Sequence, residues 1–271
     1  MRISKAERLR GVIRPRRPQP REILCLNCEN PVSGSFCSMC SQPTDTARYT
    51  AKGFFAEFLK QFKRFDAAET LLTFWELTER PGRFVREYLE GKRVDYQGPI
   101  KYFFYVFVLQ FAAGIAIRLI TGRDYNFFTI GNDAASQFVE LLATIFWGIG
   151  WWALYRRSEL NATENIVAAL YFTAQAFMFT LILRIVCLPF MSWSAKSDTI
   201  FAFVDVFVYL AYSFFFAHRL FREPPWKLVI KQSILVVLYT VILLSLAFAE
   251  KIAKSTVEQF DPAPQTSTVN P

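Results

Sequence analysis

Histidine is almost absent from this sequence, and the motifs of common enzyme active sites are missing. His218 is the only histidine among 271 residues. No nucleophile–histidine–acid set is therefore available, and we find neither a glycine-rich phosphate-binding loop nor a recognisable paired-carboxylate motif. His218 falls at the end of an apolar segment, where a cation is favourable at a helix C-terminus in any case. The sequence gives no positive support for an enzyme, so a non-enzymatic protein is favoured over the alternative, a membrane enzyme that uses Asp205 or Glu140.

Charged residues are few, and apolar residues are too abundant for an ordinary soluble domain. Apolar residues make up 53% of the chain and charged residues 20%, with 29 phenylalanines. Soluble domains contain about 45–50% apolar residues even when glycine is counted. The excess must be concentrated in part of the chain, which argues against a single soluble globule and against a disordered chain.

The first 24 residues are strongly basic but lack the apolar run of a secretion signal. They hold eight Lys or Arg against Glu7 and Glu22, a net charge of +6. Arg16-Arg17 resembles a twin-arginine pair, yet no apolar stretch of roughly 7–15 residues follows it. We expect residues 1–24 to be a disordered cytoplasmic tail. Such a tail can attract phosphate, but without interleaved aromatic residues no specific nucleic-acid partner is expected.

Five long apolar segments occupy the C-terminal two thirds of the chain. Each is close to the roughly 20 residues that an α-helix needs to cross a bilayer. In lipid the backbone must satisfy its own hydrogen bonds, so the segments are predicted to be helices. The sequence therefore predicts an all-α, polytopic membrane bundle of about five helices within residues 99–249. The segments are 99–120, 138–155, 166–188, 199–217 and 228–249.

Lys and Arg are unevenly distributed between the two sides of this bundle. With the N-terminus in the cytoplasm, twelve fall on the inner side and five on the outer side, which follows the positive-inside rule. Five spans then place the C-terminus outside, where we expect residues 250–271 to be disordered. The inner set is Arg80, Arg83, Arg86, Lys92, Arg93, Lys101, Arg156, Arg157, Arg219, Arg222, Lys227 and Lys231; the outer set is Arg118, Arg123, Lys196, Lys251 and Lys254.

Four cysteines form the strongest local motif, within residues 25–42. Two C-x-x-C pairs, Cys25/Cys28 and Cys37/Cys40, are separated by eight residues. Such pairs let four thiolates converge on one tetrahedral ion, for which structural zinc is the expected choice and rubredoxin-like iron the main alternative. A cytoplasmic location disfavours disulfides. We expect a zinc knuckle whose fold depends on the ion, and we expect Cys187 to be a small apolar residue within a span.

Residues 51–98, between the knuckle and the first span, are predicted to form amphipathic juxtamembrane helices. Phenylalanines recur at helical spacing in 51–65, a second helix is predicted over 67–79, and a third begins at Pro81. These helices either lie in the membrane interface or pack on the ends of the bundle. Four basic side chains are candidates to bind anionic lipid, although ordinary positive-inside anchoring explains them too: Arg83, Arg86, Lys92 and Arg93.

This part of the chain resembles a bacterial membrane protein family of unknown function. The resemblance rests on Glu79-Arg80-Pro81-Gly82, on residues 88–93 (YLEGKR), and on Tyr96 and Pro99, together with the N-terminal C-x-x-C pairs. It implies a zinc ribbon, several spans and a bacterial inner membrane, but no activity. Glycines are usual in the family where this chain has Glu29 and Ser41, a departure that we expect to loosen the knuckle turns while leaving the ligands intact.

The residues between 79 and 99 that carry this resemblance also have a direct physical interpretation. Gly82 lets two chain segments approach closely, Gly91 is placed to end a helix, and Pro99 begins the first span.

Ionisable residues inside the predicted spans are expected to face the bundle interior. Arg184 lies roughly 6 Å and Asp205 roughly 9 Å from the outer ends of their spans, from a helical rise of 1.5 Å per residue. We expect these two to pair, and with Arg118 and Glu140 to form a neutral cluster.

Two glutamines also fall within the spans. Gln110 and Gln175 both lie near mid-membrane and are expected to bond to each other across helices.

These observations favour a non-enzymatic membrane scaffold or regulator that contacts lipids and a cytoplasmic protein. The alternative is a small transporter or channel that uses Arg184 and Asp205 and acts as a homo-oligomer. Broken helices or inverted repeats would favour a transporter, and neither is found in the sequence.

Overall fold

The computed structural model describes residues 23–46, 49–50, 66–121, 134–187 and 195–260, and the chain is mostly helical there. A two-residue hairpin precedes the helices, with β1 (Ile23–Leu24) antiparallel to β2 (Pro31–Val32). The helices are α2 (Ala67–Glu79), α3 (Pro81–Glu90), α4 (Pro99–Thr121), α5 (Ala134–Leu154), α6 (Ala162–Cys187), α7 (Ala195–Phe221) and α8 (Pro225–Phe260), with a 3-10 turn at Arg156–Ser158.

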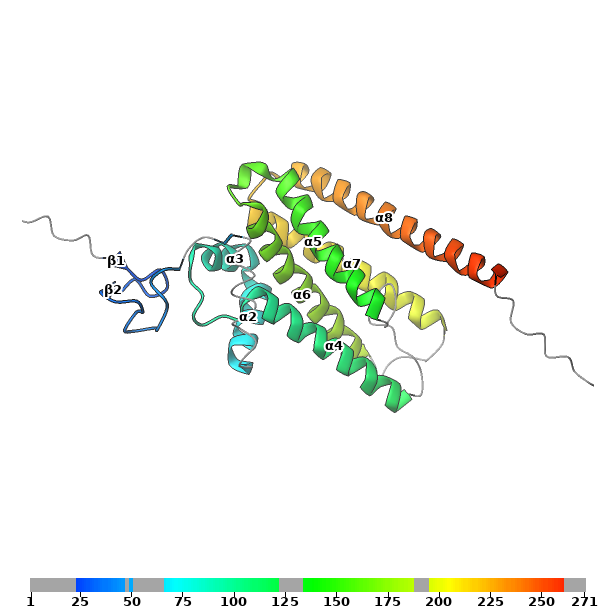
Figure 1. The fold of residues 1–271 in the computed structure, drawn as a ribbon, viewed down its shortest axis with the longest axis horizontal. Helices are drawn as coiled ribbons and strands as arrows, with labels where there is room; N and C mark the ends of the chain where they lie inside the picture. The colour runs from blue at the N-terminus through cyan, green and yellow to red at the C-terminus, as the bar shows by residue number, and fades with distance from the viewer. Residues whose placement is uncertain (1–22, 47–48, 51–65, 122–133, 188–194, 261–271) are drawn as a thin grey trace, which may run out of the picture.

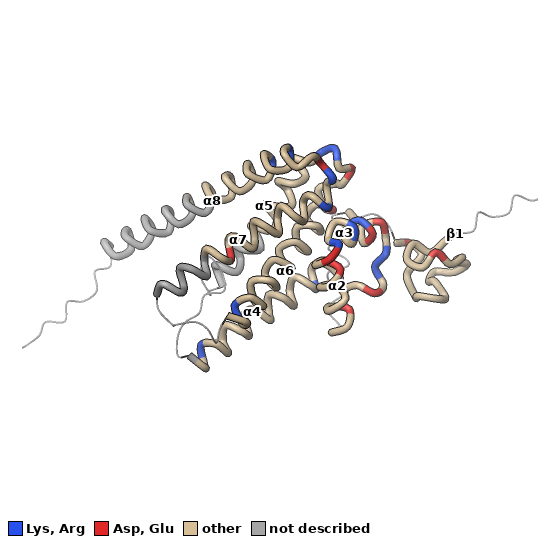
Figure 2. The backbone as a smooth tube through the Cα atoms, turned by 180° about the vertical axis from the view of Figure 1, so that it is seen from behind, with Lys and Arg blue, Asp and Glu red and all other residues tan. Residues whose placement is uncertain are grey.

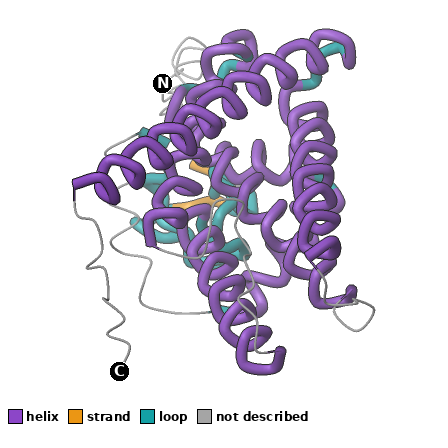
Figure 3. The backbone as a smooth tube through the Cα atoms, turned by 90° about the vertical axis from the view of Figure 1, so that its right-hand side faces the viewer, coloured by secondary structure: helices purple, strands orange, loops and turns teal. Residues whose placement is uncertain are grey.

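The long helices α4 to α8 form a bundle, and the remaining elements gather at one of its ends. Figure 1 shows α2 and α3 beside this end, with the β-hairpin beyond them. We call it the ribbon end, and the opposite end the far end. Figure 3 shows the helices from a quarter turn away. Helix α6 contacts α4, α5 and α7, and α8 contacts α5 and α7. Residues 1–22 of the basic tail and the phenylalanine-rich stretch 51–65 lie outside the described residues.

Four of the described helices are long and apolar enough to cross a membrane. Their apolar stretches are Pro99–Ile120, Ala162–Cys187, Phe203–Phe221 and Pro225–Ile242. A fifth helix, α5, has 21 residues, and its stretch from Leu142 to Leu154 is apolar. The predicted fold class, a multi-span helical membrane bundle with a four-cysteine cluster near its N-terminus, is confirmed.

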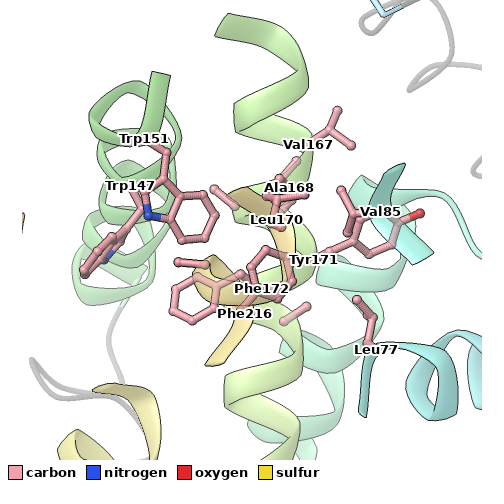
Figure 4. Close-up of a cluster of buried hydrophobic side chains, with 14 of the residues drawn as sticks. Leu77, Val85, Trp147, Trp151, Val167, Ala168, Leu170, Tyr171, Phe172 and Phe216 are labelled. Carbon is pink, nitrogen blue, oxygen red and sulfur yellow. The ribbon is translucent and has the colours of Figure 1, made fainter. Parts of the chain in front are cut away.

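Helix α6 lies at the centre of the bundle. Of its apolar stretch 67% is buried, against 17% for α4 and for α8. Figure 4 shows Phe172 of α6 facing Trp147 and Trp151 of α5. The ring centroids of Trp151 and Phe172 are 5.3 Å apart, and those of Trp151 and Phe216 of α7 are 5.5 Å apart. Aromatic side chains thus fill the space between α5, α6 and α7.

Helix α8 continues further than the sequence suggested. It ends at Phe260, so residues 250–260, which we expected to be disordered, are helical. Glu250 and Lys254 are four residues apart, an arrangement that favours a helix, and no proline lies between Pro225 and Pro262. The composition after Lys254 suits a solvated segment, but it does not prevent a helix that is already formed from continuing.

Candidate metal centre and its support

The four cysteines of the two C-x-x-C pairs converge on one point. Their Sγ atoms all lie within 4.8 Å of one another. The Cys25 and Cys40 sulfurs are 3.6 Å apart, and the Cys28 and Cys37 sulfurs 3.5 Å. A tetrahedral zinc ion with Zn–S bonds of about 2.3 Å places its sulfurs about 3.8 Å apart. The spacing of the described thiols therefore fits a four-thiolate metal site.

Two turns with the same backbone pattern present the sulfurs. In the first turn, the Cys25 N–H donates to the Asn30 carbonyl and the Glu29 N–H donates to the Cys25 carbonyl, both at 2.9 Å. The second turn repeats both bonds twelve residues later, at the same distances. Each turn thus holds two cysteines at a fixed separation, which explains why the C-x-x-C spacing recurs.

Each turn requires one residue in the left-handed backbone region. Glu29 and Ser41 both have φ of 60°, which costs a residue with a Cβ roughly 1–2 kcal/mol. These are the two positions where we expected glycine to be usual. Both turns nevertheless have their backbone hydrogen bonds, and the four cysteines converge.

The thiols differ in how readily they lose a proton. Hydrogen bonds from the side chain and backbone of Asn30 lower the pKa of Cys28 to about 6. The Asn30 Nδ2 atom lies 3.3 Å from the Cys28 Sγ atom. At Cys40 a backbone hydrogen bond from Gln42 lowers the pKa, but desolvation and the other three thiols raise it to about 12. A cation is therefore needed before all four sulfurs can be thiolates together, as metal binding requires.

The four-cysteine segment, residues 23–46, which we call the ribbon, rests on the end of α3. Gly91 follows that helix with φ of 119°, so the prediction that it ends a helix is confirmed. A Cβ atom on Gly91 would lie 2.8 Å from the Leu26 Cδ1 atom. Leu26, between the first two cysteines, therefore packs directly on the glycine, and a larger residue there would push the ribbon away.

Tyr49 provides a second attachment, between the ribbon and the helices. Its side chain is buried, and its hydroxyl lies 3.1 Å from the hydroxyl of Tyr88. Its carbonyl accepts a hydrogen bond of 3.1 Å from the Asn161 side chain. The Arg93 guanidinium lies 4.1 Å from the centre of the Tyr49 ring. The metal site is thus joined to α3 and to the start of α6.

The start of α6 is itself fixed by a capping box. The Asn161 side chain accepts from the Glu164 N–H at 2.9 Å, and the Glu164 carboxylate accepts from the Asn161 N–H at 2.8 Å. We did not identify this role from the sequence. The Asn-x-x-Glu spacing before an apolar run is the signal that would have shown it.

Helices α2 and α3 begin and end at the predicted residues. Gly82, in the first turn of α3, packs against the backbone of α7, because a Cβ atom there would lie 2.2 Å from the Arg219 carbonyl carbon. The predicted close approach at Gly82 is therefore confirmed. Arg86 donates a hydrogen bond to the Leu220 carbonyl, at the C-terminal end of α7. The N-terminal turns of α3 thus close the ribbon end of α7.

The apolar face of α3 packs on the bundle. Phe84, Val85, Tyr88 and Leu89 are buried, and the Phe84 and Tyr171 ring centroids are 5.1 Å apart. The juxtamembrane helices were expected either to lie in the membrane interface or to pack on the ends of the bundle. Helix α3 packs on the ends of the bundle helices.

The four basic residues considered for anionic lipid have partners within the protein. Arg83 and Lys92 lie on either side of Glu87, with N···O distances of 2.7 and 3.9 Å. Arg86 and Arg93 make the contacts with α7 and Tyr49 described above. Arg86 and Arg93 therefore help to attach α3 to α7 and to Tyr49, whereas the ion pairs of Arg83 and Lys92 stay at the surface of α3.

A network of polar side chains joins α2 to the bundle. It shows that the predicted hydrogen bond between Gln110 and Gln175 was wrong. Gln175 does not bond to Gln110. Its amide instead accepts from the Tyr102 hydroxyl at 2.5 Å and donates to the Thr78 hydroxyl at 2.9 Å. Gln110 donates to the Phe177 carbonyl at 2.8 Å. The expected pairing failed because α2, which lies beside α6, presents a polar partner to Gln175.

Arg184 and Asp205 form an ion pair in the far half of the bundle. The Arg184 side chain is 7% exposed and that of Asp205 16%. In addition, the Arg184 Nε atom lies 3.3 Å from an Asp205 oxygen. Arg118 is on an exposed part of α4, and the side chain of Glu140 lies outside the described residues. The pair joins α6 to α7, while the four-member cluster has only these two members in described contact.

Part of the chain is similar to a known protein family. Residues 71–111 are similar to a family described as "Protein of unknown function (DUF3667)". The match covers the second half of α2, all of α3 and the first half of α4, so it falls on the segment that attaches the ribbon to the bundle. No curated protein and no solved structure matches the chain.

Proposed function

We propose that this protein is a non-enzymatic membrane scaffold or regulator whose zinc ribbon binds a cytoplasmic protein partner. The outer surface of the ribbon carries this proposal. Ile23, Phe36 and Met39 are 65%, 63% and 72% exposed, in a module of only 24 residues. Exposed apolar side chains gathered on a small, fixed surface are typical of protein interaction sites. The attachments at Gly91 and Tyr49 hold that surface at a fixed place beside the membrane.

Zinc is the metal that the donor set favours. Four thiolates in a closed shell leave no position for a substrate, so the ion stabilises the ribbon and takes no part in a reaction. Iron held by the same four sulfurs is the alternative, and metal analysis of the purified protein distinguishes the two.

The distribution of charge supports a cytoplasmic ribbon end in a bacterial inner membrane. Figure 2 shows Lys and Arg gathered at the ribbon-end turns and on α3, with few along the described long helices. Arg156, Arg157 and Arg222 are exposed at these turns. Positive residues beside short loops favour the cytoplasmic side.

The proposal is tested by replacing the exposed ribbon side chains and identifying bound proteins. The full chain carrying Phe36→Ser and Met39→Ser is purified from membranes in mild detergent beside the unmodified chain. Loss of one or more protein partners, with metal content unchanged, is the expected result. Ser38→Ala, at an exposed position of the same turn, is the matched control and should keep those partners. An unchanged set of bound proteins in the double variant would contradict the proposal.

The Arg184–Asp205 pair favours a second candidate function, a small transporter or channel. Ionisable side chains buried between spans often mark ion or proton paths. In that case Asp205→Asn abolishes proton or ion flux in proteoliposomes, whereas a scaffold shows no flux that depends on Asp205. The scaffold is favoured because the pair is satisfied within the protein.

A further inference from the structure

The exposed face of helix α2 is apolar over most of its length. Its outward face consists of Ala67, Ala68, Leu71, Leu72 and Trp75, and ends at Glu79. Leu71, Leu72 and Trp75 are 58%, 44% and 55% exposed. A helix at a water-facing surface normally turns its polar side outward. Over its first three turns α2 presents apolar side chains outward instead.

Helix α3 follows after a single residue and has the opposite arrangement. Its exposed residues are Arg83 and Glu90, and Arg80 before it is exposed as well. Its apolar residues are buried against the bundle. Because Arg80 alone separates the two helices and they contact each other, the change in pattern between them indicates a change in surroundings, from apolar beside α2 to aqueous beside α3.

The inward face of α2 carries polar groups that are satisfied by the protein. Thr73 accepts a hydrogen bond of 2.9 Å from the Gln97 N–H, and Thr78 accepts from Gln175. At its end, the Leu77 carbonyl accepts from the Tyr212 hydroxyl at 2.9 Å.

The first turn of α2 is capped as well. The Asp66 carboxylate accepts from the N–H groups of Ala68 and Glu69, at 2.9 and 3.3 Å. A helix in an apolar medium needs its backbone groups satisfied in this way.

The outward face of α2 continues the exposed apolar surface of α4. Phe104, Leu109 and Phe111 of α4 are 42%, 47% and 47% exposed, as expected for side chains that face lipid. Figure 1 places α2 beside the first turns of α4. Gln175 links the two helices, because it bonds both to Tyr102 of α4 and to Thr78 of α2. The exposed apolar side chains of α2 and α4 thus lie on neighbouring, hydrogen-bonded helices.

We infer that α2 lies within the membrane leaflet at the ribbon end, where Leu71, Leu72 and Trp75 contact lipid acyl chains. The 13 residues of α2 are too few to cross about 30 Å of hydrocarbon, so the helix enters one leaflet only. The water boundary falls at Arg80–Pro81, and α3 lies outside it. Trp75 is suited to the region near this boundary, where tryptophan is enriched in membrane proteins. The inference rests on the membrane placement contained in the proposed function.

Photo-crosslinking in native membranes tests this position. Leu72→p-benzoylphenylalanine and Trp75→p-benzoylphenylalanine are introduced singly into the full chain, in cells grown with a radiolabelled phospholipid precursor. The matched controls are Phe104→p-benzoylphenylalanine, on the exposed face of α4, and Arg83→p-benzoylphenylalanine, on the exposed face of α3. All four side chains are exposed, so the substitutions leave the core unchanged.

The expected result is a labelled lipid adduct at positions 72 and 75 that is comparable with that at 104 and well above that at 83. A lipid adduct at position 104 without one at positions 72 and 75 would overturn the inference about α2 and leave the membrane placement of the bundle standing. So would an adduct at 72 and 75 with another protein or with another segment of this chain. Absence of lipid adducts at all four positions would overturn the membrane placement, and the inference with it.

Discussion

The fold of the ribbon and the fold of the helical bundle are stabilised by different interactions. Within residues 23–46 the buried residues are Cys25, Cys37 and Gln42, so the ribbon has almost no apolar interior. The bundle buries large aromatic side chains completely, among them Trp151 and Phe172. A four-cysteine segment without an apolar interior is expected to need a bound metal ion for a defined fold, whereas the bundle depends on close packing. Removal of the ion should therefore affect one region and leave the other intact.

Metal removal is expected to have the largest effect. Structural zinc contributes about 10–16 kcal/mol to small four-ligand sites, so chelation should unfold the ribbon. Hydrogen exchange measured by mass spectrometry should show amides of residues 23–46 losing protection while those of α6 keep theirs. Cys28→Ser should have the same effect, and Cys187→Ser, the matched control, should have none. A metal-free ribbon that stays protected would contradict this account.

Reversal of one charge in the Arg184–Asp205 pair should have the next largest effect, and it falls on the bundle. Asp205→Arg or Arg184→Asp alone leaves like charges in a little-exposed site and should cost about 3–5 kcal/mol. The double reversal should restore most of the thermal stability measured in detergent. Arg157→Asp, in the exposed turn after α5, is a control expected to change stability by about 0.5 kcal/mol or less. Failure of the double reversal to recover stability would show that the pair does not join α6 and α7.

Gly82→Ala tests the contact between α3 and α7. The added Cβ atom would lie 2.2 Å from the Arg219 carbonyl carbon, and such overpacking costs about 1–3 kcal/mol. The expected result is a lower midpoint of thermal unfolding and faster hydrogen exchange in α3. Gly34→Ala is the matched control, because a Cβ atom there has nothing within 4 Å. Equal stability of the two variants would mean that Gly82 does not contact α7.

The smallest expected effect is a gain of stability in the ribbon. Glu29→Gly and Ser41→Gly each remove left-handed strain of roughly 1–2 kcal/mol, against an entropy cost of roughly 0.5–1 kcal/mol for glycine. Each should therefore strengthen metal retention by about 0.5 kcal/mol, measured by competition with a chelator. Ser38→Gly, at a turn position outside the left-handed region, should weaken it. Weaker retention in both test variants would argue against the strain.

Much of the local structure could be predicted, because its signals are local. The C-x-x-C pairs predicted the four-thiol cluster, since two short turns suffice to bring their sulfurs together. Pro81 and Gly91 predicted the bounds of α3, since each limits the backbone in its own turn. The length and apolar character of the spans predicted the bundle, and the family match on residues 71–111 agrees with part of the resemblance seen in the sequence.

Contacts between distant segments were harder to predict. Gln175 was paired with Gln110 because depth along a helix can be estimated from sequence, whereas the rotation of one helix relative to another cannot. The role of Arg86 was missed because its acceptor, the Leu220 carbonyl, lies 134 residues away. The contact between the hydroxyls of Tyr49 and Tyr88 was likewise not predicted, because the two residues are 39 positions apart.

Composition and short-range spacing were enough to predict the membrane-spanning class, the cysteine turns and most of the helices, because each depends on neighbouring residues. They could not predict that α2 turns its apolar side chains outward while α3 buries its own. Both helices carry apolar and polar residues, and which face turns outward depends on what each helix packs against. That choice depends on the energies of contacts with α4, α6 and α7, which no single segment contains.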